Sequence, residues 1–388
     1  MLLLIVIYIS FISLGLPDSL FGVSWPVVHQ EFDVAESFAS VYTVITAVCT
    51  GGVSFAAGRV IRKFGTGKVT FFSTLLTAVG LVGISFAPNI AVMLIFSIVL
   101  GYGAGAIDTG LNSYVSLHYK AKYLNWLHCF WGMGVAVSPM IMSAFLGAGE
   151  GQWRNGYRIV ALIQLTIAMI VLLTLKKWDP AAEQVQEGTK SDMSMAQLFR
   201  LKGLPTSILS LGLYCGAEYL LGTWGATYAV HVFELAPEIA AKWVSLYYGG
   251  IMLSRIITGF VPDRFGDDLR VKAGVSVALV GIVLLALPLG NASLAGLLLI
   301  GMGFGPVFPA VIHSVPARFG AAYSADLTGY HMGGAFTLGY VVQMSFGYVA
   351  VLTGYSIMPF VLLALIVGVF AANAATIRSL KKMQELGG

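Results

Sequence analysis

Four charged side chains stand inside long apolar stretches of the sequence, and they are the first candidates for chemistry. Three are acids, Asp18, Asp108 and Glu218, and the fourth is Arg255. A charged side chain at the centre of a bilayer costs at least about 2.5 kcal/mol, so each one calls for a functional explanation. If the three acids share one aqueous cavity, we expect them to bind protons reversibly, because nearby carboxylates repel one another. The alternative to proton binding is that each acid makes only a structural hydrogen bond. For Asp18 that bond would be to backbone amides freed by the preceding proline, Pro17.

Helical spacing places a polar partner beside Asp108. Gly101, Gly105, Asp108 and Asn112 follow one another at steps of four, three and four residues, so they share one helix face. The glycines permit close helix packing. Asn112 adds an amide one turn from the carboxylate. We expect Asp108 to couple substrate movement to proton movement, and Asn112 to bind the substrate.

Other deep polar and aromatic residues are candidates for substrate binding. Aromatic faces pack well on the apolar side of a sugar ring, and amides or imidazoles bond its hydroxyl groups. A cavity histidine would also serve as a proton relay. Packing or a satisfied structural hydrogen bond is the alternative at every position. The candidates are Asn125, His128, Trp131, Trp224, Tyr228, His331 and Gln343.

The elements that position these residues must be membrane-spanning helices. Apolar residues make up 57% of the 388 residues and charged residues 10%, whereas soluble domains have roughly 25% charged residues. A span needs about 20 apolar residues. The sequence predicts an all-α membrane protein with twelve transmembrane helices, some of them tilted or kinked. Their predicted ranges are 3–29, 37–61, 69–87, 90–117, 122–147, 157–175, 205–231, 238–261, 271–288, 293–316, 323–352 and 355–377.

The positions of the basic residues predict the orientation of these helices. With the N-terminus in the cytoplasm, 18 of the 22 Lys and Arg residues fall in inner loops or the tail, and three fall in outer loops. Such a bias is the usual positive-inside pattern. We therefore expect a multi-pass protein with both termini in the cytoplasm. The short loops favour a bacterial cytoplasmic (inner) membrane.

A polar stretch divides the chain into two halves. The predicted organisation is an N-terminal six-helix bundle (1–176), a cytoplasmic linker (177–204) and a C-terminal six-helix bundle (205–388). Residues 194–202 are predicted either as a short helix on the membrane surface or as part of a solvated linker.

The two halves repeat one another. Asp18 and Gly22 recur as Glu218 and Gly222, at an offset of 200 residues. Further matches have offsets between 200 and 203, so the chain is interpreted as a duplicated six-helix unit. The same offsets relate Gly101, Gly103 and Gly105 to Gly301, Gly303 and Gly305, residues 58–65 to 259–266, and Leu124 and His128 to Leu327 and His331.

With these motifs the sequence resembles the major facilitator superfamily over nearly its whole length. Residues 58–68 and 259–270 are similar to the signature loop that follows the second helix of each half in that family. The second copy, with Asp263 and Arg264, fits the signature well. The first copy has Arg62 where the family usually has an acid. The resemblance implies alternating access, with helices one, four, seven and ten around the cavity.

Within the superfamily, the chain is most similar to the fucose:proton symporter branch, which includes glucose transporters. The similarity lies in Asp108 and Asn112, in residues 124–134 and in residues 216–218. His128 resembles an amide-bearing position of that branch, and Trp131 matches a binding-site asparagine. The resemblance implies that both positions belong to the substrate site.

Motif searches exclude several other functions. Nucleophile-elbow, zinc-protease, Walker A and dinucleotide motifs are absent in any plausible context, and GYGAGA at 101–106 lies inside a helix. We therefore expect no enzyme, no cofactor and no metal site. The absence of an ATP-binding motif indicates a secondary transporter. A receptor or enzyme in a transporter fold is the hypothesis from another class.

The charges favour a neutral substrate. Carriers of anions need a deep cation, and the only candidate, Arg255, falls one turn before Gly259 near the inner end of its helix. We expect Arg255, Asp263 and Arg264 to serve a gate or structural pairs. The predicted function is symport of a sugar or similar polyol with protons, sodium being the alternative ion, by a monomer in contact with lipids and not with nucleic acid. The alternative function is proton-driven export of lipophilic or cationic compounds.

Overall fold

The computed structural model describes residues 2–119, 121–178, 200–261, 265–320 and 324–387, and these residues form helices and no strands. They make twelve spans, as predicted, because α1 with α2 and α12 with α13 each form one broken span. The N-terminal half comprises α1 (Leu2–Asp18), α2 (Leu20–Glu31), α3 (Phe38–Phe64), α4 (Thr66–Ser85), α5 (Ile90–His118), α6 (Ala121–Leu146), α7 (Trp153–Thr174) and the turn η1 (Leu175–Lys177). The C-terminal half comprises α9 (Leu204–Phe233), α10 (Pro237–Gly259), α11 (Gly266–Ala286), η4 (Gly290–Leu294), α12 (Ala295–Phe304), α13 (Val307–Phe319), α14 (Ser324–Thr353), η6 (Tyr355–Ile357) and α15 (Met358–Gly387).

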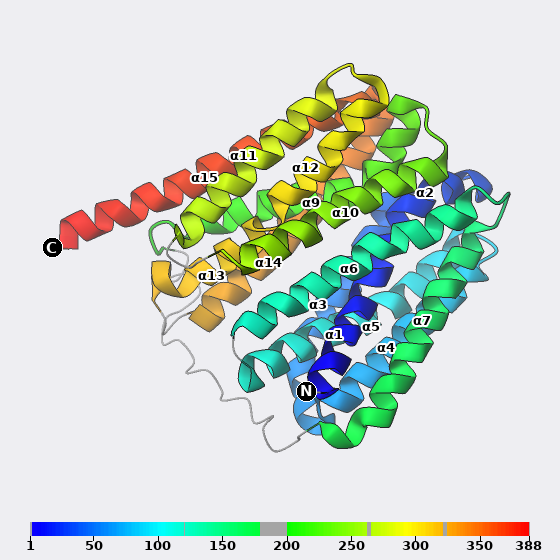
Figure 1. Cartoon of the computed structure of the whole chain (residues 1–388), viewed down its shortest axis with the longest axis horizontal. Coiled ribbons are helices and arrows are strands. Elements are labelled where there is room, and N and C mark those ends of the chain that lie inside the picture. Colours follow the sequence, from blue (N-terminus) through cyan, green and yellow to red (C-terminus); the bar gives the residue numbers. More distant parts are fainter. Residues whose placement is uncertain (1, 120, 179–199, 262–264, 321–323, 388) are drawn as a thin grey trace.

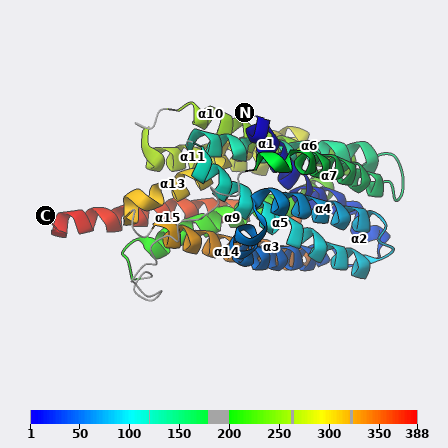
Figure 2. The ribbon, with the colours of Figure 1, turned by 90° about the horizontal axis from the view of Figure 1, so that it is seen from below.

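Most of these spans are long and apolar enough to cross a membrane by themselves. Nine of the described segments meet that criterion, and α3 contains a shorter apolar stretch, Phe38–Ser54. Helices α9 and α10 fall below it. Helix α9 is buried along most of its length, so its surface faces protein rather than lipid, and its sequence tolerates more polar residues. The last turns of α15 extend past the predicted end at residue 377 and project beyond the bundle (Figures 1 and 2).

Two spans are broken near their midpoints. The first breaks at Ser19, directly after Pro17 and Asp18. The tenth breaks at Gly305 and Pro306, between α12 and α13. Proline removes a backbone donor and its ring crowds the preceding turn, so helices bend or end at such sites. Both breaks leave irregular backbone at the depth where the intramembrane charges lie.

Equivalent glycines pack equivalent helices together in the two halves. A Cβ on Gly101 would lie 2.7 Å from the Thr46 carbonyl oxygen of α3. A Cβ on Gly301 would overlap the Tyr247 carbonyl oxygen of α10. Because Thr46 and Tyr247 are also about one repeat apart in the sequence, the same close helix contact occurs in both halves. This packing agrees with the predicted internal repeat.

The two halves lie beside each other (Figure 1) and touch along α6 and α10. The Ser143 hydroxyl donates to the Glu238 carbonyl at 2.8 Å, and the Ser245 hydroxyl donates to the Ala136 carbonyl at 2.6 Å. The ring of Trp126, near the other end of α6, lies 6.0 Å from that of Phe260 just beyond α10. This pair of helices therefore joins the halves along their length.

The second inter-half contact, between α3 and α14, is confined to one end of the bundle. This end, called here the Glu36 end, is formed by the loops at 32–37, 86–89, 147–152, 234–236, 287–294 and 354–357. Near it, the Thr43 hydroxyl donates to Gln343 Oε1 at 2.9 Å. Farther along the same helices, Gly51 and Gly333 have open space where a Cβ would stand.

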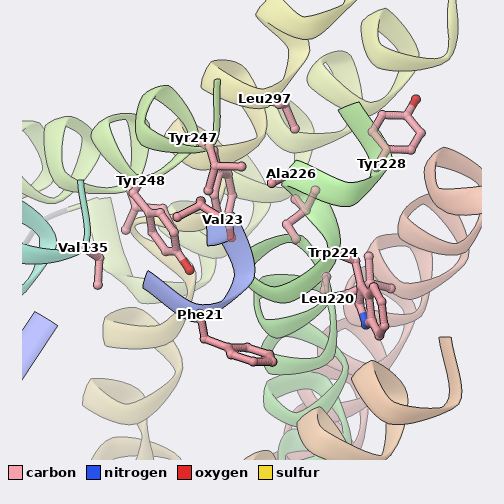
Figure 3. Close-up of a cluster of buried hydrophobic side chains, with 14 of the residues drawn as sticks. Phe21, Val23, Val135, Leu220, Trp224, Ala226, Tyr228, Tyr247, Tyr248 and Leu297 are labelled. Atoms are coloured by element: carbon pink, nitrogen blue, oxygen red, sulfur yellow. The ribbon is translucent and has the colours of Figure 1, made fainter. Parts of the chain in front are cut away.

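Buried side chains also close the Glu36 end. One hydrophobic cluster combines residues of both halves, whereas the other three each belong to one half. Figure 3 shows part of it: Phe21 and Val23 of α2 lie among residues of α9 and α10. Helices α2 and α9 approach so closely that a Cβ on Gly22 would overlap the Gly222 carbonyl. With the predicted orientation, the Glu36 end is the outer end, and it is closed by these contacts.

We predict that Gly301→Val lowers the stability of the C-terminal half. The added side chain must push α12 away from Tyr247, and overpacking of this kind costs roughly 1–3 kcal/mol. Gly249→Val is the matched control, because that helical glycine has open space at its Cβ position. Thermal unfolding of purified protein in detergent measures the difference. Equal midpoints for the two variants would contradict the assigned helix contact.

Candidate substrate and proton site

The break between α1 and α2 holds Asp18 at the centre of the bundle. Asp18 is exposed, although Pro17 and Ser19 on either side are buried. The Ser19 hydroxyl donates to the Val135 carbonyl of α6 at 2.9 Å, which ties the break to that helix. The indole N–H of Trp131, one turn earlier in α6, donates to Asp18 Oδ2 at 2.9 Å. The carboxylate therefore bonds a neighbouring side chain while it remains open to the space beside it.

Arg255 reaches the same place from the other half of the chain. Its guanidinium carbon lies 5.0 Å from the centre of the Trp131 ring, within the range of a cation–π contact. Its Nε donates to the Gly305 carbonyl at 3.4 Å, at the break in the middle of span ten. The side chain is only 9% exposed.

The guanidinium of Arg255 therefore lies closer to the central site than the position of Arg255 in the sequence suggests. Arg255 starts one turn from the inner end of α10, but helical side chains lean toward the N-terminus of their helix. For Arg255 that direction is toward the middle of the bundle. The length of the side chain then brings the guanidinium to Trp131. The sequence correctly placed the Cα of Arg255 near the end of its helix. It placed the guanidinium too far from the centre of the bundle.

Glu218 lies in α9, the helix of the C-terminal half that corresponds to the first span. It is 8% exposed on α9 and lies within electrostatic range of Arg255 and Asp18. Asp108 is the third acid within range of Asp18. The Asn112 amide donates to Asp108 Oδ1 at 2.8 Å and to its backbone carbonyl at 3.0 Å. The structure thus gathers the three acids and the single arginine that the sequence singled out.

His128 lies one turn before Trp131 on α6. Its ring makes an edge contact with Phe11 at 5.8 Å, and it is within electrostatic range of Arg255. The side chain of Asn125 lies outside the described part of the chain, as do Asp263, Arg264 and residues 194–199 of the predicted surface helix. Their predicted roles stay predictions.

Four of the predicted substrate-binding residues lie elsewhere. His331 is fully buried, with Nδ1 2.8 Å from the Leu327 carbonyl and Nε2 2.8 Å from the Ser207 hydroxyl. It joins α14 to α9. Both ring nitrogens are engaged, so in this conformation His331 has a structural role. Gln343 accepts a bond from Thr43 in the contact between the halves.

Two aromatic candidates also need correction. Trp224 is fully buried, and its indole donates to the Gln343 carbonyl at 3.1 Å. Figure 3 shows its ring on the side of α9 away from Tyr248, and the hydroxyl of Tyr228 points out of the cluster. Tyr228 lines a separate, largely apolar pocket with Phe233 and Phe360. Spacing along α9 put these rings at a suitable depth, but the helix face that they occupy turns toward packing partners.

Sequence reasoning missed three tyrosines of the C-terminal half. Tyr219 of α9, Tyr248 of α10 and Tyr340 of α14 all lie within electrostatic range of Asp18. The rings of Tyr219 and Tyr340 are 4.8 Å apart, and Figure 3 shows the Tyr248 hydroxyl pointing toward α2. Their midspan positions were a usable signal, because interfacial tyrosines usually lie near span ends.

The cluster offers chemistry for binding and protonation. It provides carboxylates, an imidazole and hydroxyl groups beside an aromatic ring. Among the residues that the structure describes, no group of three or more His, Cys, Asp or Glu side chains is arranged to hold a metal ion. The acids come from spans one, four and seven, and the arginine from span eight. Both halves therefore contribute charged groups to one central site.

A family model described as Major Facilitator Superfamily matches residues 7–344. The chain belongs to the Major Facilitator Superfamily. Its members are transporters, so the chain is an integral multi-pass membrane transporter. The family fold agrees with the twelve spans in two halves seen here.

Known relatives are distant. The chain is 22% identical over 286 residues to "Bypass of stop codon protein 6" of Saccharomyces cerevisiae, covering 67% of this chain and 57% of that protein. It therefore spans little more than half of that relative. It is 23% identical over 322 residues to "Glucose/mannose transporter GlcP" of Bacillus subtilis, covering 79% and 77% of the two chains.

Among solved structures, the E. coli fucose:proton symporter FucP in its outward conformation superposes with a TM-score of 0.67. The identity is 16%, and the match covers 96% of this chain and 98% of FucP. At this identity the match supports the major facilitator fold and not the substrate.

We predict that Asp18 is accessible to water-soluble thiol reagents and that the adjacent Ser19 is not. Asp18→Cys, in a Cys49→Ala background, should react quickly with a charged methanethiosulfonate, because the native side chain is exposed. Ser19→Cys is the matched control, because Ser19 is buried and bonded to α6. Mass spectrometry of the purified protein measures the labelling rates. Equal rates would mean that Asp18 does not face an aqueous space.

Proposed function

We propose that this transporter moves a sugar or a similar neutral polyol across the membrane together with protons, by alternating access. The observation that supports it best is the position of Trp131. Its N–H bonds Asp18 of its own half, and its ring contacts Arg255 of the other half. A sugar packed on an indole face presents its hydroxyl groups to the edge of the ring, where the carboxylate lies.

The charges around Trp131 support a neutral substrate. Asp18, Asp108 and Glu218 bring negative charge, and Arg255 offsets part of it. An anionic ligand would add to the carboxylates and a cationic ligand would meet the guanidinium. Hydroxyl groups satisfy both kinds of neighbour, because each one donates to a carboxylate and accepts from a guanidinium.

The same arrangement disfavours export of lipophilic cations. Such a substrate would rely on the acids as counter-charges, but Arg255 is already within electrostatic range of Glu218. A fixed guanidinium beside the site repels a second cation. The similarity to GlcP agrees with the sugar proposal.

Proton coupling is supported by the number of acids. When the halves close around the substrate, the central space loses water, and nearby carboxylates become costly to keep charged together. Uptake of a proton relieves that repulsion. Asp108 is the best placed to exchange it, because Asn112 keeps a hydrogen bond to its carboxyl group.

We predict that Trp131→Ala weakens sugar binding by roughly 1–3 kcal/mol, the scale of burying a large apolar side chain. Trp131→Phe should lose less, because it keeps an aromatic face and loses only the N–H. Trp224→Phe is the matched control at a fully buried tryptophan outside the central cluster. Calorimetric titration of a sugar panel into detergent-solubilised protein measures the affinities. Wild-type affinity in both Trp131 variants would remove Trp131 from the site.

We further predict that Asp108→Asn abolishes sugar accumulation driven by a pH gradient and leaves exchange across the membrane partly intact. The amide cannot take up and release a proton, but it still bonds Asn112. Asp33→Asn is the control, because Asp33 is an exposed loop residue with φ 50°, a conformation that Asn also adopts. Uptake and counterflow of labelled sugar in proteoliposomes distinguish the two effects. Concentrative uptake by Asp108→Asn would exclude Asp108 as the coupling residue.

A further inference from the structure

Four side chains converge on the loop residue Glu36, three of them on its carboxylate, and they come from both halves of the protein. Glu36 lies between α2 and α3. His231 Nε2 of α9 is 2.6 Å from Glu36 Oε1, and the Tyr355 hydroxyl of η6 donates to Oε2 at 2.7 Å. From its own half, His29 Nε2 lies 3.2 Å from Oε1, and the Trp25 indole donates to the Glu36 carbonyl at 2.8 Å.

This cluster, the Glu36 latch, spans the contact that closes one end of the transporter. His231 and Tyr355 belong to the C-terminal half, and their rings stack with centroids 4.8 Å apart. Glu36 and His29 belong to the N-terminal half. Separation of the halves at this end breaks the bonds from His231 and Tyr355. The latch therefore exists only in the closed conformation.

His29 is placed so that its full set of bonds requires a charged ring. Its Nδ1 lies 3.3 Å from the Val34 carbonyl, which can only accept, so Nδ1 must hold a proton. In a neutral imidazole Nε2 then has none. That atom is buried, lies 3.2 Å from Glu36 Oε1, and makes no hydrogen bond among the described residues. A second proton turns a lone pair facing a carboxylate into a charge-assisted hydrogen bond.

We propose that the Glu36 latch is operated by a proton, and that closure of this end is coupled to protonation of His29. The proposal requires only that the halves part at this end during transport, and it does not depend on the substrate. Acidification strengthens the bond between His29 and Glu36, which holds Glu36 in position for His231 and Tyr355. The closed conformation is therefore favoured by acidification.

Glu36 itself does not set this pH dependence. Burial raises the pKa of Glu36, but hydrogen bonds from His29, His231 and Tyr355, with the charge of His231, lower it to about 2. A lowered carboxyl pKa contributes stability that is present above its ordinary range and is lost only as pH falls toward 2. Between pH 5 and 8 the carboxylate stays ionised, so the change comes from the histidines.

A second bonded carboxylate at this end joins residues of one half only. Glu31 pairs with Arg154, and its Oε2 accepts a bond from the Trp153 indole at 2.6 Å. Arg154 also donates to the Ala87 carbonyl at 3.1 Å. All four residues belong to the N-terminal half. Glu31 is therefore a matched control, because it is a bonded carboxylate at the same end that does not join the halves.

The test measures the distance between the two halves at this end as a function of pH. Spin labels at Glu150→Cys and Ala292→Cys report it, since both positions are exposed and lie in loops of opposite halves. Cys49 is replaced by Ala, and the buried Cys129 and Cys215 remain. Double electron–electron resonance between pH 5 and pH 8, in lipid nanodiscs, then gives the populations of short and long distances.

The wild-type protein should show a rising ratio of closed to open conformations as pH falls. One proton linked to closure changes this ratio by up to about tenfold per pH unit. His29→Gln should flatten that slope by one proton, because the amide cannot take up a charge. Since the central acids add a pH dependence of their own, the decisive quantity is the difference between variant and wild type. Identical slopes in the two proteins would overturn the proposal.

Two further variants distinguish the effect of His29 protonation from the effect of the hydrogen bonds between the halves. Tyr355→Phe removes one inter-half bond without a titrating group in this range, so it should lower the closed population equally at every pH. Glu31→Gln should leave both the slope and the populations unchanged. If Glu31→Gln flattens the slope as much as His29→Gln does, the pH dependence does not come from the latch. Failure of sugar transport would leave these measurements unaffected.

Discussion

A charge inside a bilayer must find a partner within the protein, and the centre of this transporter is organised around that constraint. Asp18 bonds the Trp131 indole, and the ring of Trp131 supports Arg255 from the opposite half. The helix break at Gly305 supplies a backbone carbonyl that accepts a bond from Arg255. The charged side chains therefore connect the two halves at the depth where a substrate would be bound.

The repeat gives the two halves the same internal scaffold and different chemistry. Gly101 and Gly301 bring equivalent helix pairs into close contact, so the helices within each half are tightly packed. The central residues differ: Asp18 and Glu218 occupy equivalent positions, whereas Arg255 is the one intramembrane cation predicted from the sequence. The N-terminal half contributes Asp18 and Asp108 to the central site, whereas the C-terminal half contributes Glu218, Arg255 and three tyrosines.

Closure at one end uses a different set of interactions from the central site. Apolar packing between α2 and α9 closes the end. The Glu36 latch adds hydrogen bonds and ion pairs, which require a particular geometry and a particular protonation state of the side chains. Apolar burial is not directional, whereas hydrogen bonds to a carboxylate are. The latch therefore gives the closed state a specific geometry, and protonation of His29 makes the population of that state depend on pH.

Hydrophobic length and the repeat were enough to predict twelve spans in two halves, because both depend on local composition or on internal symmetry. The direction in which a side chain points was not available from that information. Trp224 and His331 lie at plausible depths but face helix contacts, and Arg255 extends to the centre from a Cα near a helix end. The Glu36 latch joins residues up to 319 positions apart, and no spacing in the chain indicates it. Which faces meet is decided by packing between helices, so only the tertiary structure determined the site.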